Sequence, residues 1–227
     1  MKISEDFVKN DVPAEGQMKD TDCVSFHTVE NAAIKVLFLG NSITRHGKAE
    51  ALGWYGDWGM AASCEENDYV HRLVSYLEHD GKRVSYCVAN LSEWERSRDS
   101  SLLKSRYAAA RAFQANVVIV RLGENAQLAE NLHTFMPCYV NMVEFFSDHG
   151  ARVVLTDLFW EYEPFDRFVK ELAAKKGYAF VPLHDLGDRD EMKAKGRFAH
   201  AGVAAHPGDQ GMAEIAKRIA FAIKSIK

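Results

Sequence analysis

Residues 34–44 read IKVLFLGNSIT, an apolar run that ends in a Gly-Asn-Ser turn. An apolar run without polar alternation is typical of a parallel strand that is buried on both faces. Four further runs of this kind follow along the chain, and helical periodicity fills the intervals between them. These further strands are predicted at Arg83–Ala89, Val117–Leu122, Arg152–Leu158 and Ala179–Pro182.

The segments between the predicted strands carry apolar residues at the 3.6-residue spacing of amphipathic helices. The predicted helices are Tyr69–Leu77, Leu102–Phe113, Leu132–His149, Phe165–Lys176 and Met212–Ile226. Glycine follows two of them, at Gly150 and Gly177, as is common at helix ends. Strands that alternate with helical crossovers predict an α/β fold: a single doubly wound, flavodoxin-like, five-stranded parallel sheet flanked by helices.

The N-terminal region differs from the rest of the chain. Residues 1–33 mix acidic residues, Lys, Gly and Pro without sustained periodicity, although residues 24–29 alternate well enough for a short strand. No internal repeat, low-complexity tract or linker interrupts the remainder. We therefore expect residues 1–33 to be an extension that packs on one α/β domain formed by residues 34–227.

Composition excludes several classes of function. The chain has 227 residues, of which 47% are hydrophobic and 26% charged, as in an ordinary globular protein. Its 28 basic and 32 acidic residues give a net charge of -4, which offers no field to attract nucleic acid. The N-terminus lacks the apolar region of a signal peptide, and no apolar run approaches the ~18 residues of a membrane span. We expect a cytoplasmic protein without nucleic-acid or membrane partners.

Four cysteines are spread along the chain, at Cys23, Cys64, Cys87 and Cys138. Their spacing matches neither a disulfide framework nor a zinc site, so reduced thiols are predicted. His200 and His206 share a loop but lack the carboxylate and spacing of the known zinc motifs. No metal and no cofactor is therefore predicted.

Chemically useful side chains follow the predicted strands. Ser42 follows the first strand, Asn125 follows the third, and His206 lies in the loop before the last helix. Ligands of open parallel sheets bind beyond the carboxyl ends of the strands, where these residues should meet. Serine becomes a nucleophile when a base removes its proton, and the resulting oxyanion needs hydrogen-bond donors. Ser42, His206 and Asn125 are the candidates for nucleophile, base and amide donor.

This order of Ser, Asn and His, with glycine in the first two motifs, resembles the SGNH (GDSL-like) hydrolase family. Gly40–Thr44 (GNSIT) matches its nucleophile block, Gly123-Glu124-Asn125 its third block and His206-Pro207 its last block. Residues 53–63 and 206–212 resemble a bacterial subfamily of unassigned substrate. The resemblance implies a serine esterase that acts on a small acyl ester, with an O-acetylated carbohydrate as the favoured substrate.

The last block departs from the family pattern at its acidic position. Val203 stands where the family has the Asp that orients the histidine. The Val203 side chain cannot accept a hydrogen bond, so we predict a Ser-His dyad in which a main-chain carbonyl near Val203 or Ala204 orients His206. Such a histidine is expected to titrate near its free pKa of ~6.5. Asp209 is the alternative third member, although its position before the last helix favours a cap.

The second block lacks the glycine whose N–H completes the oxyanion hole in the family. Counting from Asn90, that function falls to the backbone near Glu95. The tryptophans Trp54, Trp58 and Trp160 are candidates for a wall that stacks on a sugar or shields the acyl group. Packing in the core is the alternative for each tryptophan.

Two other functions remain open at this point. Ser42 alone could cap a helix, and the turn Gly40–Ser42 could bind a phosphate as flavodoxin-type loops do. The missing Asp and Gly also allow a catalytically weak or inactive ligand-binding module on the same fold. The fold alone cannot separate these alternatives from an esterase, because function resides in the site.

Overall fold

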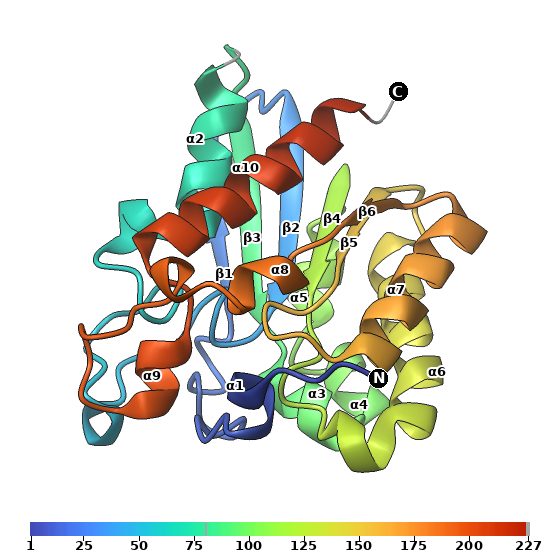
Figure 1. Cartoon of the computed structure of the whole chain (residues 1–227). Helices are drawn as coiled ribbons and strands as arrows, with labels where there is room; N and C mark the ends of the chain where they lie inside the picture. Colours follow the sequence, from blue (N-terminus) through green and yellow to red (C-terminus); the bar gives the residue numbers. More distant parts are fainter. Residues whose placement is uncertain (80, 226–227) are drawn as a thin grey trace.

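The computed structural model describes residues 1–79 and 81–225. These residues form a six-stranded sheet with the order β1-β3-β2-β4-β5-β6 and with helices on both faces (Figure 1). The strands are β1 Val24–His27, β2 Ile34–Gly40, β3 Val84–Asn90, β4 Val117–Arg121, β5 Arg152–Thr156 and β6 Ala179–Val181. Strands β2 to β6 pair in parallel. The predicted α/β architecture, a mostly parallel sheet flanked by helices, is confirmed.

The predicted count of five strands is wrong by one. Strand β1 pairs antiparallel with β3, with Val24 opposite Ala89, and forms one edge of the sheet. The alternation over residues 24–29 reflects this strand. A strand at the edge of a sheet pairs with a single neighbour. Whether Val24–His27 joins the sheet therefore depends on where the chain before β2 folds back.

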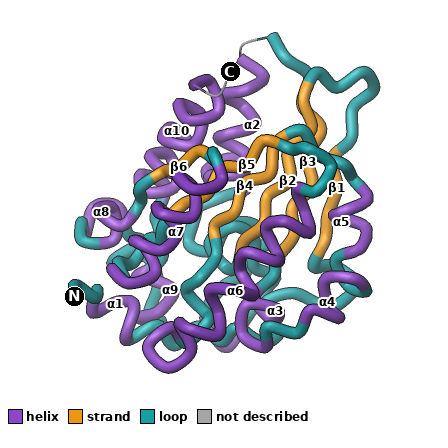
Figure 2. The backbone as a smooth tube through the Cα atoms, turned by 90° about the vertical axis from the view of Figure 1, so that its right-hand side faces the viewer, coloured by secondary structure: helices purple, strands orange, loops and turns teal. Residues whose placement is uncertain are grey.

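Helices cover both faces of the sheet. They are α1 Glu5–Val8, α2 Tyr69–His79, α3 Ser92–Ser97, α4 Ser100–Lys104, α5 Ala108–Ala112, α6 Leu128–Ser147, α7 Glu163–Lys176, α8 His184–Gly187, α9 Ala201–Ala205 and α10 Asp209–Ser225, with short 3-10 helices at Glu50–Leu52, Glu65–Asn67 and Asp190–Met192. Residues of α2 and α10 bury one face, and residues of α5, α6 and α7 bury the other. Figure 2 shows α2 and α10 on one side of the strands and α5 and α6 on the other.

Two predicted helices differ most from the observed ones. The helix predicted over Leu102–Phe113 is divided into α4 and α5. Between them the Ser105 hydroxyl donates to the carbonyl of Ser101 at 2.8 Å, and such side-chain bonds to the backbone compete with helix propagation. Helix α6 begins at Leu128, before the predicted start. The predicted end at Ile226 lies outside the described residues.

The longest helix among the described residues is α6. Helix α6 has 20 residues and includes Pro137. Across residues 1–79 and 81–225, no helix combines the length and the apolar character that crossing a bilayer requires.

Candidate active site

Ser42 lies in a tight turn directly after β2. The carbonyl of Gly40 accepts from the N–H of Leu91 at 2.7 Å, and that of Asn41 accepts from the N–H of Thr44 at 2.8 Å. A Cβ atom on Gly40 would lie 1.7 Å from Oγ1 of Thr44, so this turn requires glycine. The turn places Ser42 at the carboxyl end of the central strand, with 5% of the residue exposed.

His206 follows α9 and faces Ser42. Its Nε2 atom lies 2.9 Å from Oγ of Ser42, and its Nδ1 atom lies 2.7 Å from the carbonyl oxygen of Gly202. A carbonyl can only accept, so Nδ1 carries the proton and Nε2 is free to accept from the Ser42 hydroxyl. The two side chains, 164 positions apart in the sequence, form a hydrogen-bonded pair.

The group that orients His206 belongs to the backbone of α9. It is the carbonyl of Gly202, the residue before Val203, where the sequence has no acid. Asp209, the alternative third member, accepts instead from the N–H and the hydroxyl of Ser63, both at 2.7 Å. Asp209 therefore ties down the loop after the nucleophile, and its carboxylate is occupied there.

Burial sets the protonation of His206. The residue is fully buried, and the ring of Trp160 packs edge-on against it with 5.0 Å between centroids. Burial lowers the pKa of His206 to about 3, against the opposing effect of the Gly202 carbonyl. The expectation of a titration near the free value is thus replaced: His206 stays neutral, and able to accept a proton, well below pH 6.5.

This burial predicts an unusual pH dependence. We expect kcat/KM for an ester to stay level as the pH falls through ~6.5, because the neutral imidazole persists in the free enzyme. The measurement is a pH–rate profile of ester hydrolysis over the range in which the fold is stable. An acidic limb centred near the free histidine pKa would show that the base is not this buried side chain.

The same shift has a consequence for stability. In the unfolded chain His206 binds a proton below pH ~6.5, whereas in the folded chain it does so only near pH 3. The unfolded state then binds more protons between these values, so the free energy of unfolding decreases as the pH falls through them. The variant His206→Gln, which lacks this titration, should lose less stability between pH 7 and 5 than the parent chain.

A buried polar network lies beside the nucleophile turn. The Asn41 amide donates to Glu124 at 2.8 Å, with longer contacts of 3.3 Å to both oxygens of Glu95. Arg121 donates to the side-chain oxygen of Asn41 at 2.8 Å and to Glu124 at 2.7 Å. Arg121 is fully buried. The sequence alone indicated no role for Glu124 or Arg121, although the lone charge of Arg121 in the otherwise apolar run VVIVRL was a signal.

Glu95 takes part through its side chain rather than its backbone. Its N–H, the predicted oxyanion donor, donates to the carbonyl of Leu91 at 2.8 Å within α3 and is therefore occupied. Its carboxylate accepts from the N–H of Asn125 at 3.1 Å, from the Asn125 amide at 2.8 Å and from the N–H of Gly123. Burial and the neighbouring charge of Glu124 raise the pKa of Glu95. Glu95 thus holds the loop that carries Asn125.

The three tryptophans do not form one wall. Trp54 is buried and packs against Trp58, with 5.6 Å between ring centroids, and its Nε1 donates to the backbone of His46. Trp58 borders a separate cavity of about 390 Å³. Trp160 covers His206 and borders a small cavity of about 80 Å³. The structure therefore corrects the predicted common aromatic wall: Trp54 packs in the core, and Trp160 packs against His206.

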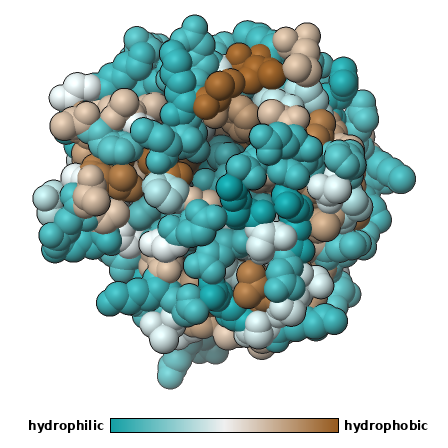
Figure 3. Space-filling model, turned by 90° about the horizontal axis from the view of Figure 1, so that it is seen from below, coloured by the Kyte–Doolittle hydropathy of each residue, from teal (hydrophilic) through white to brown (hydrophobic). Residues whose placement is uncertain are grey.

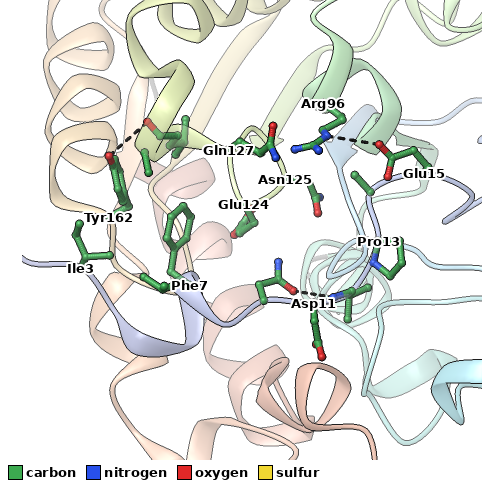
Figure 4. A pocket seen from close by; sticks show the side chains of 16 residues that line it. Ile3, Phe7, Asp11, Pro13, Glu15, Arg96, Glu124, Asn125, Gln127 and Tyr162 are labelled. Carbon is green, nitrogen blue, oxygen red and sulfur yellow. Dashed lines mark hydrogen bonds and ion pairs between the residues drawn. The ribbon is translucent and has the colours of Figure 1, made fainter.

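A larger cavity lies beside Asn125 (Figure 4). Its volume is about 440 Å³, and Glu124 and Asn125 are among the residues that line it. Its aromatic lining comes from Phe7 and Tyr162, neither of which the sequence analysis singled out. Seen from the side where α1, α3 and α9 lie, the molecular surface is mostly hydrophilic with separate apolar patches (Figure 3).

Among the described residues, no group of three or more His, Cys, Asp and Glu side chains has an arrangement that could hold a metal ion. His200, which shares the loop with His206, caps α9 by accepting from the N–H of Val203 at 3.4 Å. His200 therefore has a structural role, as the cap at the start of α9.

Solved structures share this fold. The psychrotrophic esterase EstA from a Pseudoalteromonas species matches with a TM-score of 0.59 and 13% identity over 84% of this chain and 96% of that one. The lipase Lip_vut3 from a goat rumen metagenome matches with a TM-score of 0.57 and 16% identity, over 84% of this chain and 97% of that one. A protein named as a GDSL-like lipase from Parabacteroides merdae matches with a TM-score of 0.57 and 16% identity, over 85% of this chain and 96% of that one.

No family model and no curated protein sequence matches the chain. At identities of 13% and 16% the similarity to solved structures concerns the fold. The chain has the α/β fold of GDSL-type esterases and lipases, and its Ser-His pair lies at the carboxyl edge of that fold's sheet.

Proposed function

We propose that the chain is a serine esterase of the SGNH type that hydrolyses a small acyl ester through a Ser-His dyad. The observation that carries the proposal is the 2.9 Å contact between Ser42 Oγ and His206 Nε2, with Nδ1 held by the Gly202 carbonyl. This is the geometry in which a neutral imidazole accepts the proton of a serine hydroxyl.

The reaction then follows in two halves. His206 takes the proton of Ser42 as Oγ attacks the ester carbonyl, and it returns this proton to the departing alcohol. In the second half His206 takes a proton from water as the water oxygen attacks the acyl carbon. The bond from this carbon to Ser42 Oγ then breaks, His206 returns the proton to Ser42, and the carboxylic acid leaves. The N–H of Ser42 and an amide N–H of Asn125 are the proposed donors to the oxyanion, since Glu95 accepts from only one amide hydrogen of Asn125.

The missing acid limits the rate. The Gly202 carbonyl fixes the tautomer of His206, as a carboxylate would, but it carries no full charge. It therefore stabilises the imidazolium formed in the transition state less than an Asp does. A dyad of modest activity is the expected result.

The proposed acyl group is acetyl, and the proposed alcohol is part of a carbohydrate. Ser42 is 5% exposed, and His206 is fully buried with the ring of Trp160 packed against it, so little space surrounds the reacting atoms. Space for a larger group exists in the cavity beside Asn125. This arrangement supports a small acyl group with a larger alcohol.

Hydrolysis of 4-nitrophenyl esters of increasing acyl length tests this function. We expect kcat/KM to be highest for the acetate and to fall toward the octanoate, because the long chain cannot be accommodated beside the buried dyad. Equal or higher kcat/KM for the octanoate would contradict the small acyl group, and no hydrolysis of any ester would contradict the esterase.

A ligand-binding module of weak or no activity is the second candidate. It is favoured by the carboxylates of Glu95 and Glu124, which lie beside Asn125 and oppose the negative charge of an oxyanion. A module would bind an acetate ester with the same affinity in the presence and absence of Ser42, and without release of alcohol. Measured turnover that depends on Ser42 separates the two candidates.

A further inference from the structure

The first residues of the chain cross the carboxyl edge of the sheet, where the dyad lies (Figure 1). Near one end, the N–H of Ser4 donates to the carbonyl of Glu161 at 2.7 Å. Near the other end, the carbonyl of Gln17 accepts from the N–H of Gly47 at 2.8 Å, and its side-chain oxygen accepts from the amide of Asn90 at 3.0 Å. We call residues 2–17 the N-terminal strap.

The middle of the strap lies directly on the support of the dyad. A Cβ atom on Gly202 would come within 2.0 Å of a carboxylate oxygen of Asp11 and 3.2 Å of the Val12 side chain. Val12 is buried in one cluster with Val203 and Trp54. The strap therefore covers the turn of α9 whose carbonyl orients His206.

The strap also forms one side of the cavity beside Asn125. Ile3, Phe7 and Val8 line the cavity from the strap. Leu128 and Tyr162 line it from the body of the domain. The rings of Phe7 and Tyr162 lie 5.0 Å apart, so the strap completes the apolar part of the cavity.

The polar part of the same cavity has a different composition. Asn10, Arg96 and Gln127 line it, together with Glu15, whose carboxylate lies 3.5 Å from Arg96 (Figure 4). A cavity with an apolar side and a side rich in hydrogen-bonding groups suits a molecule with one apolar face and several hydroxyl groups.

We propose that the N-terminal strap is a wall of the substrate site that selects the alcohol half of the ester, with Phe7 as a specificity-determining residue. The proposal rests on the esterase function. Asn125, the proposed oxyanion donor, lines the cavity, whereas Trp160, which packs against His206, does not line it. The alcohol half therefore occupies this cavity, against Phe7.

Acetate esters that differ only in the alcohol test this wall. Phe7→Ala should lower the ratio of kcat/KM for 1-naphthyl acetate to that for ethyl acetate by about tenfold, mainly through KM, because the larger alcohol loses an apolar contact. Phe7→Leu should lower this ratio less. Because leucine keeps most of the packing against Tyr162, this variant also serves as the test if Phe7→Ala impairs folding. Phe26→Ala is the matched control, since Phe26 lies on β1 against Phe113 and outside this cavity.

A binding measurement separates the wall from the esterase function. In the Ser42→Ala chain, calorimetric titration with 1-naphthyl acetate should show about tenfold weaker binding when Phe7→Ala is added and no change with Phe26→Ala. An unchanged ester ratio together with unchanged affinity would overturn the strap as a wall. Absence of hydrolysis with Phe7-dependent binding would instead overturn the esterase function and leave the wall standing.

Discussion

Ser42→Ala is expected to lower kcat for acetate ester hydrolysis by about a thousandfold or more, while the protein still folds. Removing the nucleophile of such a site leaves only the acceleration that binding and the oxyanion donors supply, on the order of 10³–10⁴ over water. Initial rates with 4-nitrophenyl acetate, measured after the folded state of each variant has been checked, give the comparison.

The loss should be specific to this serine. Ser147→Ala is a suitable control, because the Ser147 hydroxyl donates within α6 to the carbonyl of Val143 at 2.8 Å and has no part in the dyad. Its rate should equal that of the parent chain. Near-parental turnover in Ser42→Ala would show that the observed hydrolysis does not pass through Ser42, and the nucleophile assignment would be wrong.

Arg121→Met is expected to reduce the free energy of unfolding by about 3–5 kcal/mol, the largest effect on stability that we predict. Arg121 is fully buried, and its guanidinium bonds to Glu124 and Asn41. Methionine fills a comparable volume but leaves Glu124 and the nearby Glu95 without a cation. Urea denaturation of the two chains gives the difference.

Two comparisons isolate the charge. Arg111→Met removes an arginine whose ion pair with Asp148 is exposed, so we expect a loss within about 1 kcal/mol. Arg121→Met combined with Glu124→Gln should recover part of the loss, because a buried charge is removed along with its partner. A loss below about 1 kcal/mol for Arg121→Met alone would show that the network is not held by charge.

The loss in Arg121→Met should also grow with pH. Carboxylates buried without a cation have raised pKa values and bind protons in the folded state that they lack in the unfolded state. Such groups favour folding at low pH, and this contribution is lost as the pH rises through the folded-state pKa. The Arg121→Met chain should therefore be closer in stability to its parent at pH 5.5 than at pH 8.

Local sequence was sufficient for much of the fold. The run from Ile34 to Gly40 is apolar at nearly every position, and it is a central strand with parallel neighbours on both sides. The amphipathic spacing that begins at Tyr69 likewise marks α2. Patterns of this kind work because a strand or helix satisfies its backbone through near neighbours, and its apolar face shows which side must be buried.

The tertiary structure alone decided how distant segments meet. The sequence indicated that His206 lacks an acid, but it could not show that the carbonyl of Gly202 takes that place or that Trp160 buries the ring. It also could not show that the carboxylate of Glu95 holds Asn125. The residue types are visible in the sequence, while the distances between them depend on the packing of the whole sheet and its loops.

The N-terminal region shows the same division most clearly. Alternation over residues 24–29 indicates a strand, but its place at the edge beside β3 follows from where the chain turns back to β2. Residues 2–17 carry no periodicity that points to their position across the carboxyl edge, since their bonds to Glu161, Gly47 and Asn90 are all long-range. Local pattern determined most of the strands and helices and the nucleophile turn of this protein, whereas the surroundings of the dyad and its cavity arose from contacts between segments far apart in the chain.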